Sequence, residues 1–448
     1  MDMFDLIIIG AGPGGYEMAA EAAGHGLTVG IVERDLLGGT CLNRGCIPTK
    51  ALCRNAEVVN LVKEASQWGI TTSDITLDYA TAFARKNEVA TQLRDGVTML
   101  MGQPGITVIN GEASFKDTHT ITVGGEDYEA KNIVIATGSA PRGLPIPGAE
   151  LCMTSDDVLA MDTLPASLCI VGGGVIGMEF AAIFQSFGVD VTVIEYCKEI
   201  LPPFDKDIAK RLKTVLSKRG IKVITQAAVK AVAKGDDGLL TVTYDAKGKE
   251  QTASAERVLM SVGRQPVLPT GLNTIGVTVS RRGIEVDEHM QTNVEAVYAI
   301  GDVNGLCMLA HAASAQGEVA LAHILGKPCH VRLDIVPSAV FTVPELSMVG
   351  LTEDQCTERG MNVVVKKSFF RSNGKAVSMG ETDGLIKMIV DADTRKIVGC
   401  HICGAHAADL IQEVVMAMNA DVTVDCLAGS IHGHPTLTEV VMAAARQF

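Results

Sequence analysis

The hydrophobic pattern near the start of the chain predicts a strand, a tight turn and a helix. Residues 6–23, LIIIGAGPGGYEMAAEAA, begin with an apolar run, pass through glycines and continue as an alanine-rich segment. A second apolar run, TVGIVE at 28–33, ends in an acidic residue. Because short apolar runs flank a helical pattern, we expect an α/β structure with a parallel sheet.

The same pattern recurs in the middle of the chain. The stretch LCIVGGGVIGMEFAAIF at 168–184 is followed by VTVIE at 191–195. Both copies contain G-x-G-x-x-G, and in both the first glycine precedes the acid by 23 residues. Two glycine turns without a ligand are the alternative interpretation. Two copies with the same spacing nevertheless favour two dinucleotide-binding sites.

Each glycine of such a motif has its own physical task. Gly10 permits a tight turn, Gly12 lets the backbone approach a pyrophosphate, and Gly15 lets the helix pack on the strand. The helix N-terminus then faces the phosphates, and Glu33 can accept from ribose hydroxyls. The second copy supplies the equivalent residues Gly172, Gly174, Gly177 and Glu195. An acid at 195 would repel a 2′-phosphate, so NAD is expected there rather than NADP.

Three later apolar runs also end at glycine. They are NIVIATGSAPR at 132–142, RVLMSVGRQP at 257–266 and VYAIGDV at 297–303. The last of them places Asp302 just after a predicted strand, at the sheet edge where open α/β sheets bind ligands. The alternative is that Asp302 is an ordinary turn residue.

Composition narrows the functional classes. The 448 residues suggest about three domains, and 47% of them are hydrophobic. A net charge of −14 opposes nucleic-acid binding. No apolar run reaches membrane-spanning length, and the first residues, MDMFD, lack the basic residues of a signal peptide. We therefore expect a cytoplasmic protein that binds neither membrane nor nucleic acid.

One cysteine pair stands apart from the other cysteines. Most of the twelve lie in apolar contexts, such as Cys152 and Cys169, and are expected in the core. Cys41 and Cys46 lie instead in the glycine-rich segment GGTCLNRGCIPTK at 38–50. In a reducing compartment a cycling disulfide is expected rather than a structural one. Two dinucleotide sites in one chain predict that one binds NAD and the other binds a flavin, because flavin is the usual electron partner of NAD.

A second close pair, Cys400 and Cys403, forms a C-x-x-C sequence within the segment GCHICGAHAADLI at 399–411. A thioredoxin-like role is one interpretation, but that motif needs a βα context. Strand alternation would place the two side chains on opposite faces of a sheet, which favours a core role.

The segment GGTCLNRGCIPTK resembles the redox-active motif of the class I pyridine nucleotide-disulfide oxidoreductases, in the version carried by the dihydrolipoyl dehydrogenase branch. The segment IHGHPTLTEVV at 431–441 resembles the His-Pro-Thr…Glu segment of the same family. The resemblance implies that Cys41 is the outer sulfur and Cys46 the inner one. It also implies that His434 is a base oriented by Glu439. Pro435 is expected to open a helix that brings Glu439 to the imidazole.

The resemblance also implies FAD and NAD as cofactors, no metal, and a set of contact residues. Lys50 is expected beside the flavin, paired with Glu179. His311 is a further expected flavin contact, and the alternative is that it is a plain helix-start residue. The expected flavin contacts are Gly10, Gly12, Gly14, Gly15, Glu33, Lys50, Ala113, Thr137, Gly138, Asp302, Met308, Leu309, Ala310 and His311. The expected contacts on the NAD or flavin side of the second half are Gly172, Gly174, Val175, Ile176, Gly177, Glu179, Glu195 and Gly263.

The family pattern implies two Rossmann-like domains and a C-terminal α+β dimerisation domain. We expect a discontinuous FAD domain at 1–142 and 265–330, an NAD domain at 143–264, and an interface domain at 331–448. Residues 221–260 should be rich in strands. The apolar runs at 411–420 and 440–445 are expected to form interface helices of a homodimer.

The resulting functional prediction is reoxidation of protein-bound dihydrolipoamide to lipoamide, with electrons passing through the disulfide and FAD to NAD⁺. The partner would be a lipoyl-bearing protein of a 2-oxo acid dehydrogenase complex or of the glycine cleavage system. Two alternatives stay open: a reductase that uses NADH or NADPH to reduce a small disulfide, and a binding protein in which flavin is only scaffolding.

Overall fold

The computed structural model describes residues 3–448 and divides into two compact units. Unit 1 contains Met1–Ala51, Thr81–Arg142 and Gly263–Leu333, and unit 2 contains Leu52–Ala80, Gly143–Val262 and Asp334–Phe448. Unit 2 groups the second nucleotide-binding half with the C-terminal sheet. The division into three domains therefore stays a prediction.

Unit 1 is built on a seven-stranded sheet in the order β3-β2-β1-β6-β5-β4, with β16 also paired to β6. Its strands are β1 (Phe4–Ile9), β2 (Val29–Glu33), β3 (Ile106–Asn110), β4 (Ala113–Phe115), β5 (Thr120–Val123), β6 (Glu126–Ile135) and β16 (Val297–Ala299). Strands β1, β2, β3, β16 and the end of β6 run parallel, whereas β4, β5 and the start of β6 are antiparallel. The remaining elements are α1 (Pro13–Gly24), α2 (Gly39–Arg44), β7 (Ser139–Pro141), β15 (Arg264–Pro266), α8 (Leu272–Ile275), η3 (Gly301–Asn304) and α9 (Ala310–Ile324), with α3 (Cys46–Lys63) and α4 (Tyr79–Met101) shared with unit 2.

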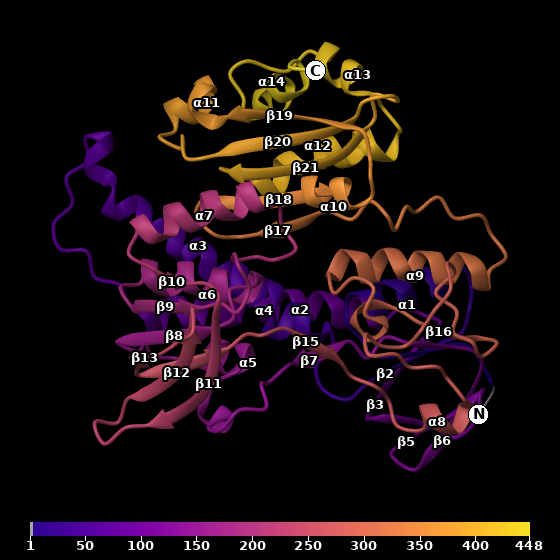
Figure 1. The fold of residues 1–448 in the computed structure, drawn as a ribbon. Helices are drawn as coiled ribbons and strands as arrows, with labels where there is room; N and C mark the ends of the chain where they lie inside the picture. Colours follow the sequence, from indigo (N-terminus) through magenta and orange to yellow (C-terminus); the bar gives the residue numbers. More distant parts are fainter. Residues whose placement is uncertain (1–2) are drawn as a thin grey trace. The chain divides into compact units, whose positions relative to one another are not determined.

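Alternation along β1 determines what covers each face of this sheet. Leu6 and Ile8 are fully buried and pack with residues of α1 and α9. Ile7 and Ile9 point to the other face and pack with residues of β4, β5 and α8. In Figure 1 helices α1 and α9 run side by side along the first face.

Unit 2 contains the second nucleotide-binding half. Its parallel sheet has the order β10-β9-β8-β14, and beside it stands an antiparallel sheet, β11-β12-β13. The elements are η1 (Ala65–Trp68), η2 (Ala149–Leu151), α5 (Ser155–Ala160), β8 (Ser167–Val171), α6 (Val175–Ser186), β9 (Asp190–Ile194), α7 (Lys206–Lys218), β10 (Lys222–Ile224), β11 (Ala227–Lys234), β12 (Leu240–Ala246), β13 (Lys249–Ala255) and β14 (Arg257–Met260). The strand-rich prediction for 221–260 is confirmed.

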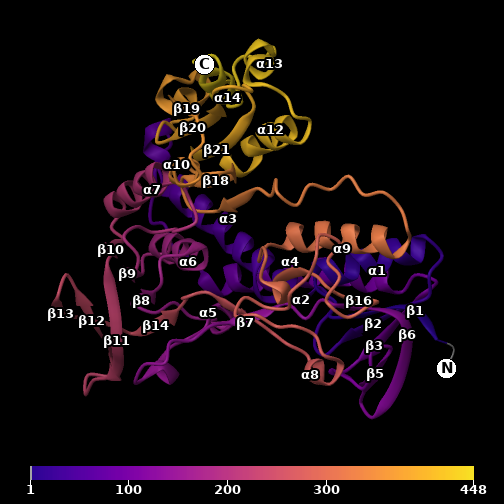
Figure 2. The same ribbon diagram turned by 45° about the vertical axis from the view of Figure 1, so that its right-hand side comes forward.

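The C-terminal part of unit 2 is an antiparallel sheet of order β17-β18-β21-β20-β19, with helices packed against it (Figure 2). Its elements are β17 (Ser338–Val340), β18 (Glu345–Gly350), α10 (Glu353–Glu358), β19 (Val363–Phe369), η4 (Phe370–Ser372), α11 (Gly374–Ser378), β20 (Leu385–Asp391), β21 (Ile397–Gly404), α12 (Ala407–Asn419), α13 (Val424–Gly429) and α14 (Glu439–Ala445). Apolar residues of α12 and α14 form one core with β20 and β21.

One expectation for this C-terminal part was wrong in detail. The helix of the His-Pro-Thr segment begins at Glu439 and not at Pro435, because hydrogen bonds of Thr436 to Gly433 and Glu439 hold the intervening residues in turns. The apolar run at 440–445 is mostly buried against its own sheet, and its place in an interface between two chains stays a prediction. In the run at 411–420, the largest exposed apolar side chain is Met416.

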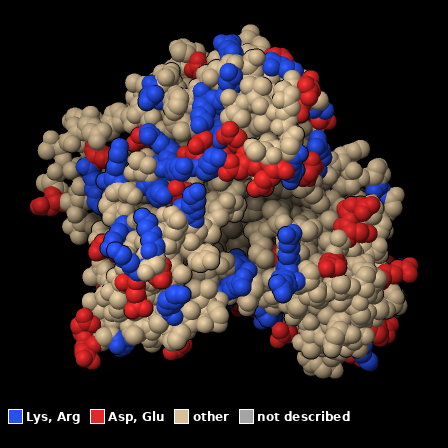
Figure 3. All heavy atoms as spheres, viewed as in Figure 1, with Lys and Arg blue, Asp and Glu red and all other residues tan. Residues whose placement is uncertain are grey.

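A buried ion network joins α7 to the C-terminal sheet. The Lys387 side chain is fully buried, and its Nζ donates to Asp205 and Asp207 at 2.8–3.0 Å and lies 2.6 Å from Glu353. Figure 3 shows Lys and Arg side chains gathered over the region of α7. Arg211 of this helix pairs with Asp383 at 2.6 Å. The acidic net charge is therefore unevenly distributed. Burying a charge without such partners would be strongly destabilising, so the network ties α7 to the sheet.

Candidate active site

The cysteine pair lies where two helices of the N-terminal segment meet. Cys41 is in α2 and Cys46 is the first residue of α3, with Gly45 between the helices. The two cysteines form a disulfide, with their Cα atoms 4.7 Å apart. A side chain on Gly45 would press on the Thr40 carbonyl oxygen at 2.9 Å, so the tight connection requires glycine. The predicted pairing is confirmed.

Polar side chains hold the disulfide turn from both sides. The Asn43 amide donates to the carbonyl oxygens of Leu37 and Gly39, each at 3.0 Å. Arg94 from α4 donates to the side-chain Oδ1 of Asn43 at 3.0 Å. Thr49 Oγ1 donates to the Gly45 carbonyl at 2.7 Å. These bonds fix the backbone around a disulfide that has to open and close.

The glycine motifs have the shape that a dinucleotide pyrophosphate needs. A methyl group on Gly10 would collide with the carbonyl oxygen of Ala136, and one on Gly15 with that of Gly10. At Gly12 the nearest atom is 3.9 Å away, so the space over the second glycine is open. Gly12 is also the N-cap of α1, and no side chain caps that helix, so the positive end of the helix dipole faces this open space and favours a phosphate there.

The second motif repeats this arrangement. Gly172 and Gly177 pack against backbone oxygens of Ser261 and Gly172, whereas nothing lies within 4 Å of a methyl group placed on Gly174. Gly174 is the uncapped N-cap of α6. In both halves two glycines serve packing and one faces open space, so the chain fits two dinucleotides.

The two acids that are predicted to bind ribose each accept two backbone hydrogen bonds from equivalent positions. Glu33 accepts from the N–H groups of Ala11 and Asp35, both at 2.9 Å. Glu195 accepts from those of Gly173 at 2.5 Å and Cys197 at 2.6 Å. Burial raises the pKa of Glu33, and the Ala11 N–H opposes that shift. A carboxylate fixed by two backbone bonds keeps lone pairs for ribose hydroxyls.

The predicted Asp302 belongs to a cluster of three side chains in unit 1. Its carboxylate accepts a hydrogen bond from Ser139 Oγ, and Arg264 Nε lies 3.8 Å away. Arg264 also donates to Ser139 Oγ and to the Ser139 carbonyl, both at 2.7 Å. The cluster joins the paired strands β7 and β15, which follow the two repeated halves. Sequence reasoning missed Ser139 and Arg264, although both follow a glycine that ends an apolar run.

The other predicted flavin contacts lie in several elements. Lys50 is in α3 and Ala113 begins β4, while Gly138 precedes β7. The Thr137 hydroxyl donates to the Val267 carbonyl at 2.5 Å. A side chain on Gly14 would meet the Ala313 carbonyl oxygen at 2.9 Å, so Gly14 also serves the packing of α1 on α9. The segment from Met308 to His311 leads into α9, with Leu309 as N-cap and His311 exposed.

The remaining predictions for the second half fall around α6. Val175 and Ile176 are its first two residues, and Gly263 follows β14 with a φ of +115°. Glu179 is 3% exposed, and its Oε1 accepts from the Phe341 N–H at 2.9 Å.

His434 pairs with a carboxylate of its own segment, 431–441. His434 Nδ1 lies 3.0 Å from Glu439 Oε1, and the Thr436 N–H holds the other carboxylate oxygen at 2.9 Å. That N–H, followed by the His434 contact, holds the pKa of Glu439 below its usual range. Across residues 3–448, His434 Nε2 makes no hydrogen bond, so it is the nitrogen that can take a proton.

Cys400 and Cys403 do not form such a site. Both are free thiols on β21 and both are fully buried. Burial raises the pKa of Cys403 to about 12 and that of Cys400 further. Because the thiolate is the reactive species, the pair fits a core role.

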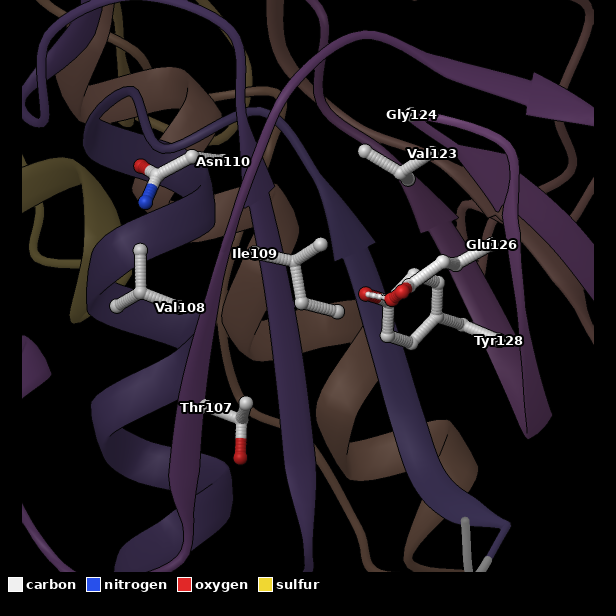
Figure 4. A pocket seen from close by; sticks show the side chains of 8 residues that line it. All are labelled: Thr107, Val108, Ile109, Asn110, Val123, Gly124, Glu126 and Tyr128. Atoms are coloured by element: carbon white, nitrogen blue, oxygen red, sulfur yellow. Dashed lines mark hydrogen bonds between the residues drawn. The ribbon is translucent and has the colours of Figure 1, made fainter.

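A cavity of about 400 Å³ in unit 1 contains none of these residues (Figure 4). It is lined by Thr107, Val108, Ile109, Asn110, Val123, Gly124, Glu126 and Tyr128. In the part of the chain that the structure describes, no three His, Cys, Asp or Glu side chains are placed to hold a metal. No helix among residues 3–448 is long and apolar enough to cross a membrane.

Comparison with known families accounts for these sites. Residues 4–317 match the model of the pyridine nucleotide-disulphide oxidoreductases, and residues 336–445 match the dimerisation domain of the same family. The chain belongs to this family. The predicted fold class is thereby confirmed, and this pyridine nucleotide-disulphide oxidoreductase is a flavoprotein enzyme of a family that uses FAD and NAD(H).

Three similar proteins illustrate the range of this family. A dihydrolipoyl dehydrogenase of Chlamydia pneumoniae is 39% identical over 443 residues, covering 98% of this chain and 95% of the relative. One of Bacillus subtilis (strain 168) is 40% identical over 462 residues, covering 99% and 97%. The solved structure of the HOCl-induced flavoprotein disulfide reductase RclA from Escherichia coli is 30% identical, with a TM-score of 0.88 and 99% of both chains covered.

Proposed function

We propose that this enzyme is a dihydrolipoyl dehydrogenase, which oxidises dihydrolipoamide on a carrier protein and reduces NAD⁺. The observation that carries the proposal is the Cys41–Cys46 disulfide, set in a unit with a dinucleotide cradle, together with a paired His434 and Glu439. Curated relatives at about 40% identity over almost the whole chain bear this name.

In the proposed reaction His434 acts as the base for the substrate dithiol. Nε2 accepts the proton of one substrate thiol, and Glu439 at Nδ1 stabilises the resulting imidazolium. The thiolate attacks Sγ of Cys41, which breaks the Cys41–Cys46 bond and forms a mixed disulfide. Cys46 leaves as a thiolate.

The second substrate sulfur completes the exchange. It attacks the substrate sulfur of the mixed disulfide, which closes the lipoamide ring and releases Cys41, and the released Cys41 thiolate takes up the proton of this second thiol. The substrate loses two electrons and two protons, and the cysteine pair gains the two electrons. When bound, FAD supplies the two-electron chemistry that connects the reduced cysteine pair to NAD⁺.

Residues of both halves would hold the cofactors. Glu33, Asp302 and the N-terminus of α1 would bind FAD, with Lys50 and Glu179 near its ring system. Glu195 and the N-terminus of α6 would bind NAD. The other contacts proposed from the sequence lie in the two glycine motifs, at the start of α9, at the start of β4, just before β7 and just after β14.

The proposed assembly is a homodimer in the cytoplasm. The match to a dimerisation domain supports the homodimer. The physiological substrate would be a lipoyl-bearing protein of a 2-oxo acid dehydrogenase complex or of the glycine cleavage system.

A direct test combines a spectrum with two assays. The purified protein should show flavin absorption in the visible range and a long-wavelength band on reduction by dihydrolipoamide. It should form NADH from dihydrolipoamide and NAD⁺. If NADH-driven reduction of a small disulfide is instead faster than any lipoamide reaction, the chain is a reductase and the proposal is wrong.

Cofactor preference gives a separate prediction. We expect kcat/KM for NAD⁺ to exceed that for NADP⁺ by about a hundredfold, or about 2.8 kcal/mol, because the Glu195 carboxylate repels a 2′-phosphate. Glu195→Ala should narrow this ratio. As a matched control, Asp190→Asn removes a charge from the exposed start of β9, the strand that leads to Glu195, and should leave the ratio of the two kcat/KM values unchanged. Equal values in the native enzyme would contradict the assignment.

A further inference from the structure

We propose that His432 and Glu413 form a second histidine–carboxylate pair, which positions the loop that carries His434. The inference rests on the proposed role of His434 as the base. His432 Nε2 lies 2.7 Å from Glu413 Oε1, a shorter separation than the 3.0 Å between His434 and Glu439. Only 6% of the His432 side chain is exposed, against 77% for His434.

The hydrogen bonds of His432 differ in kind from those of His434. Nδ1 of His432 lies 3.1 Å from the Ser430 carbonyl oxygen, so both ring nitrogens face oxygen atoms that only accept. His432 is therefore held by an oxygen atom on each side of the ring, and neither ring nitrogen is left open to a substrate proton. It cannot be the base, whereas His434 keeps Nε2 open.

The loop needs such an anchor because residues 430–438 lie in neither helix nor strand. On the C-terminal side of His434, the Asn373 amide donates to the Thr436 carbonyl at 3.0 Å. Asn373 is 6% exposed and also caps α11. On the N-terminal side, Ser430 Oγ donates to the Cys426 carbonyl of α13 at 2.9 Å, and His432 ties the loop to α12 through Glu413.

Charge strengthens this arrangement. A charge-assisted bond is about twice as strong as a neutral one, and Glu413 lies on a helix whose other face is buried in the core. Removing the carboxylate would leave the nearly buried His432 ring without its partner on α12. The loop would then lose its attachment to α12, and the ring of His434 would sample positions away from Glu439.

The test compares Glu413→Gln with Asp409→Asn in the purified holoenzyme. Asp409 lies one turn earlier on α12 with an 88% exposed side chain, so its change removes the same charge without touching the loop. Ring signals of His434 are followed by NMR with ¹⁵N-labelled histidine and identified by their loss in His434→Ala. We expect them to shift or broaden in Glu413→Gln and to stay in place in Asp409→Asn.

Steady-state kinetics provide a second test of the same proposal. Glu413→Gln should lower kcat/KM for dihydrolipoamide by about ten- to a hundredfold and leave NADH–ferricyanide activity, which needs no base, at the native level. Unchanged His434 signals, or equal shifts in both variants, would overturn the proposal, as would equal loss of both activities. If Glu413→Gln does not fold, His432→Gln replaces it with the same expected outcomes. If native enzyme fails to oxidise dihydrolipoamide, the proposed function falls while the NMR comparison still decides positioning.

Discussion

Cys41→Ser is expected to retain flavin and to oxidise dihydrolipoamide at no more than a few per cent of the native rate. Serine oxygen cannot take part in disulfide exchange, so the variant has no disulfide that the substrate thiolate can attack. Because Cys41 lies in α2 with its neighbours held by Asn43 and Arg94, the single-atom change should leave the surrounding fold intact. Flavin content, NADH–ferricyanide activity and the dihydrolipoamide:NAD⁺ assay measure the effect.

Cys53→Ser is the matched control for this change. Cys53 lies in α3, two turns after Cys46. It is 5% exposed, and its thiol donates to the Phe341 carbonyl at 3.3 Å. A serine hydroxyl can make the same bond, so activity should stay close to native. Substantial dihydrolipoamide oxidation by Cys41→Ser would mean that the disulfide does not carry the electrons.

The second large effect is recovery of activity by mixing two inactive enzymes. Cys46→Ser and His434→Ala dimers should each be inactive, and mixtures that exchange subunits should reach about a quarter of the native activity. The reason is that each proposed site combines the disulfide of one chain with the histidine of the other. A mixed dimer then keeps one complete site.

The structure of unit 2 motivates this expectation. The His434 side chain is 77% exposed, and the neighbouring Ile431 is 99% exposed. A base that takes a thiol proton works better when water is excluded, so both side chains need a covering surface. Mixing Cys46→Ser with Cys41→Ser is the control, because every site then lacks a cysteine. If the first mixture stays inactive despite proven exchange, each site lies within one chain.

The sequence by itself determined the parts of the site that depend on short spacing. Repeated glycines and acids predicted two cradles, and the structure shows the same backbone bonds to Glu33 and Glu195 in both. The neighbouring Cys41 and Cys46 could be paired for the same reason. Backbone sterics and a few intervening residues decide such features, so they can be read without knowledge of distant contacts.

Only the tertiary structure decided the contacts between distant residues. Arg264 reaches Ser139 because the strands β7 and β15 pair. Glu413 reaches His432 because α12 packs on the same sheet as α14, the helix that follows the loop. It also decided that the apolar residues of α14 cover their own sheet, which a hydrophobic run alone does not distinguish from an interface. Apolar periodicity shows that a face is buried, but its partner is selected by packing across the whole chain.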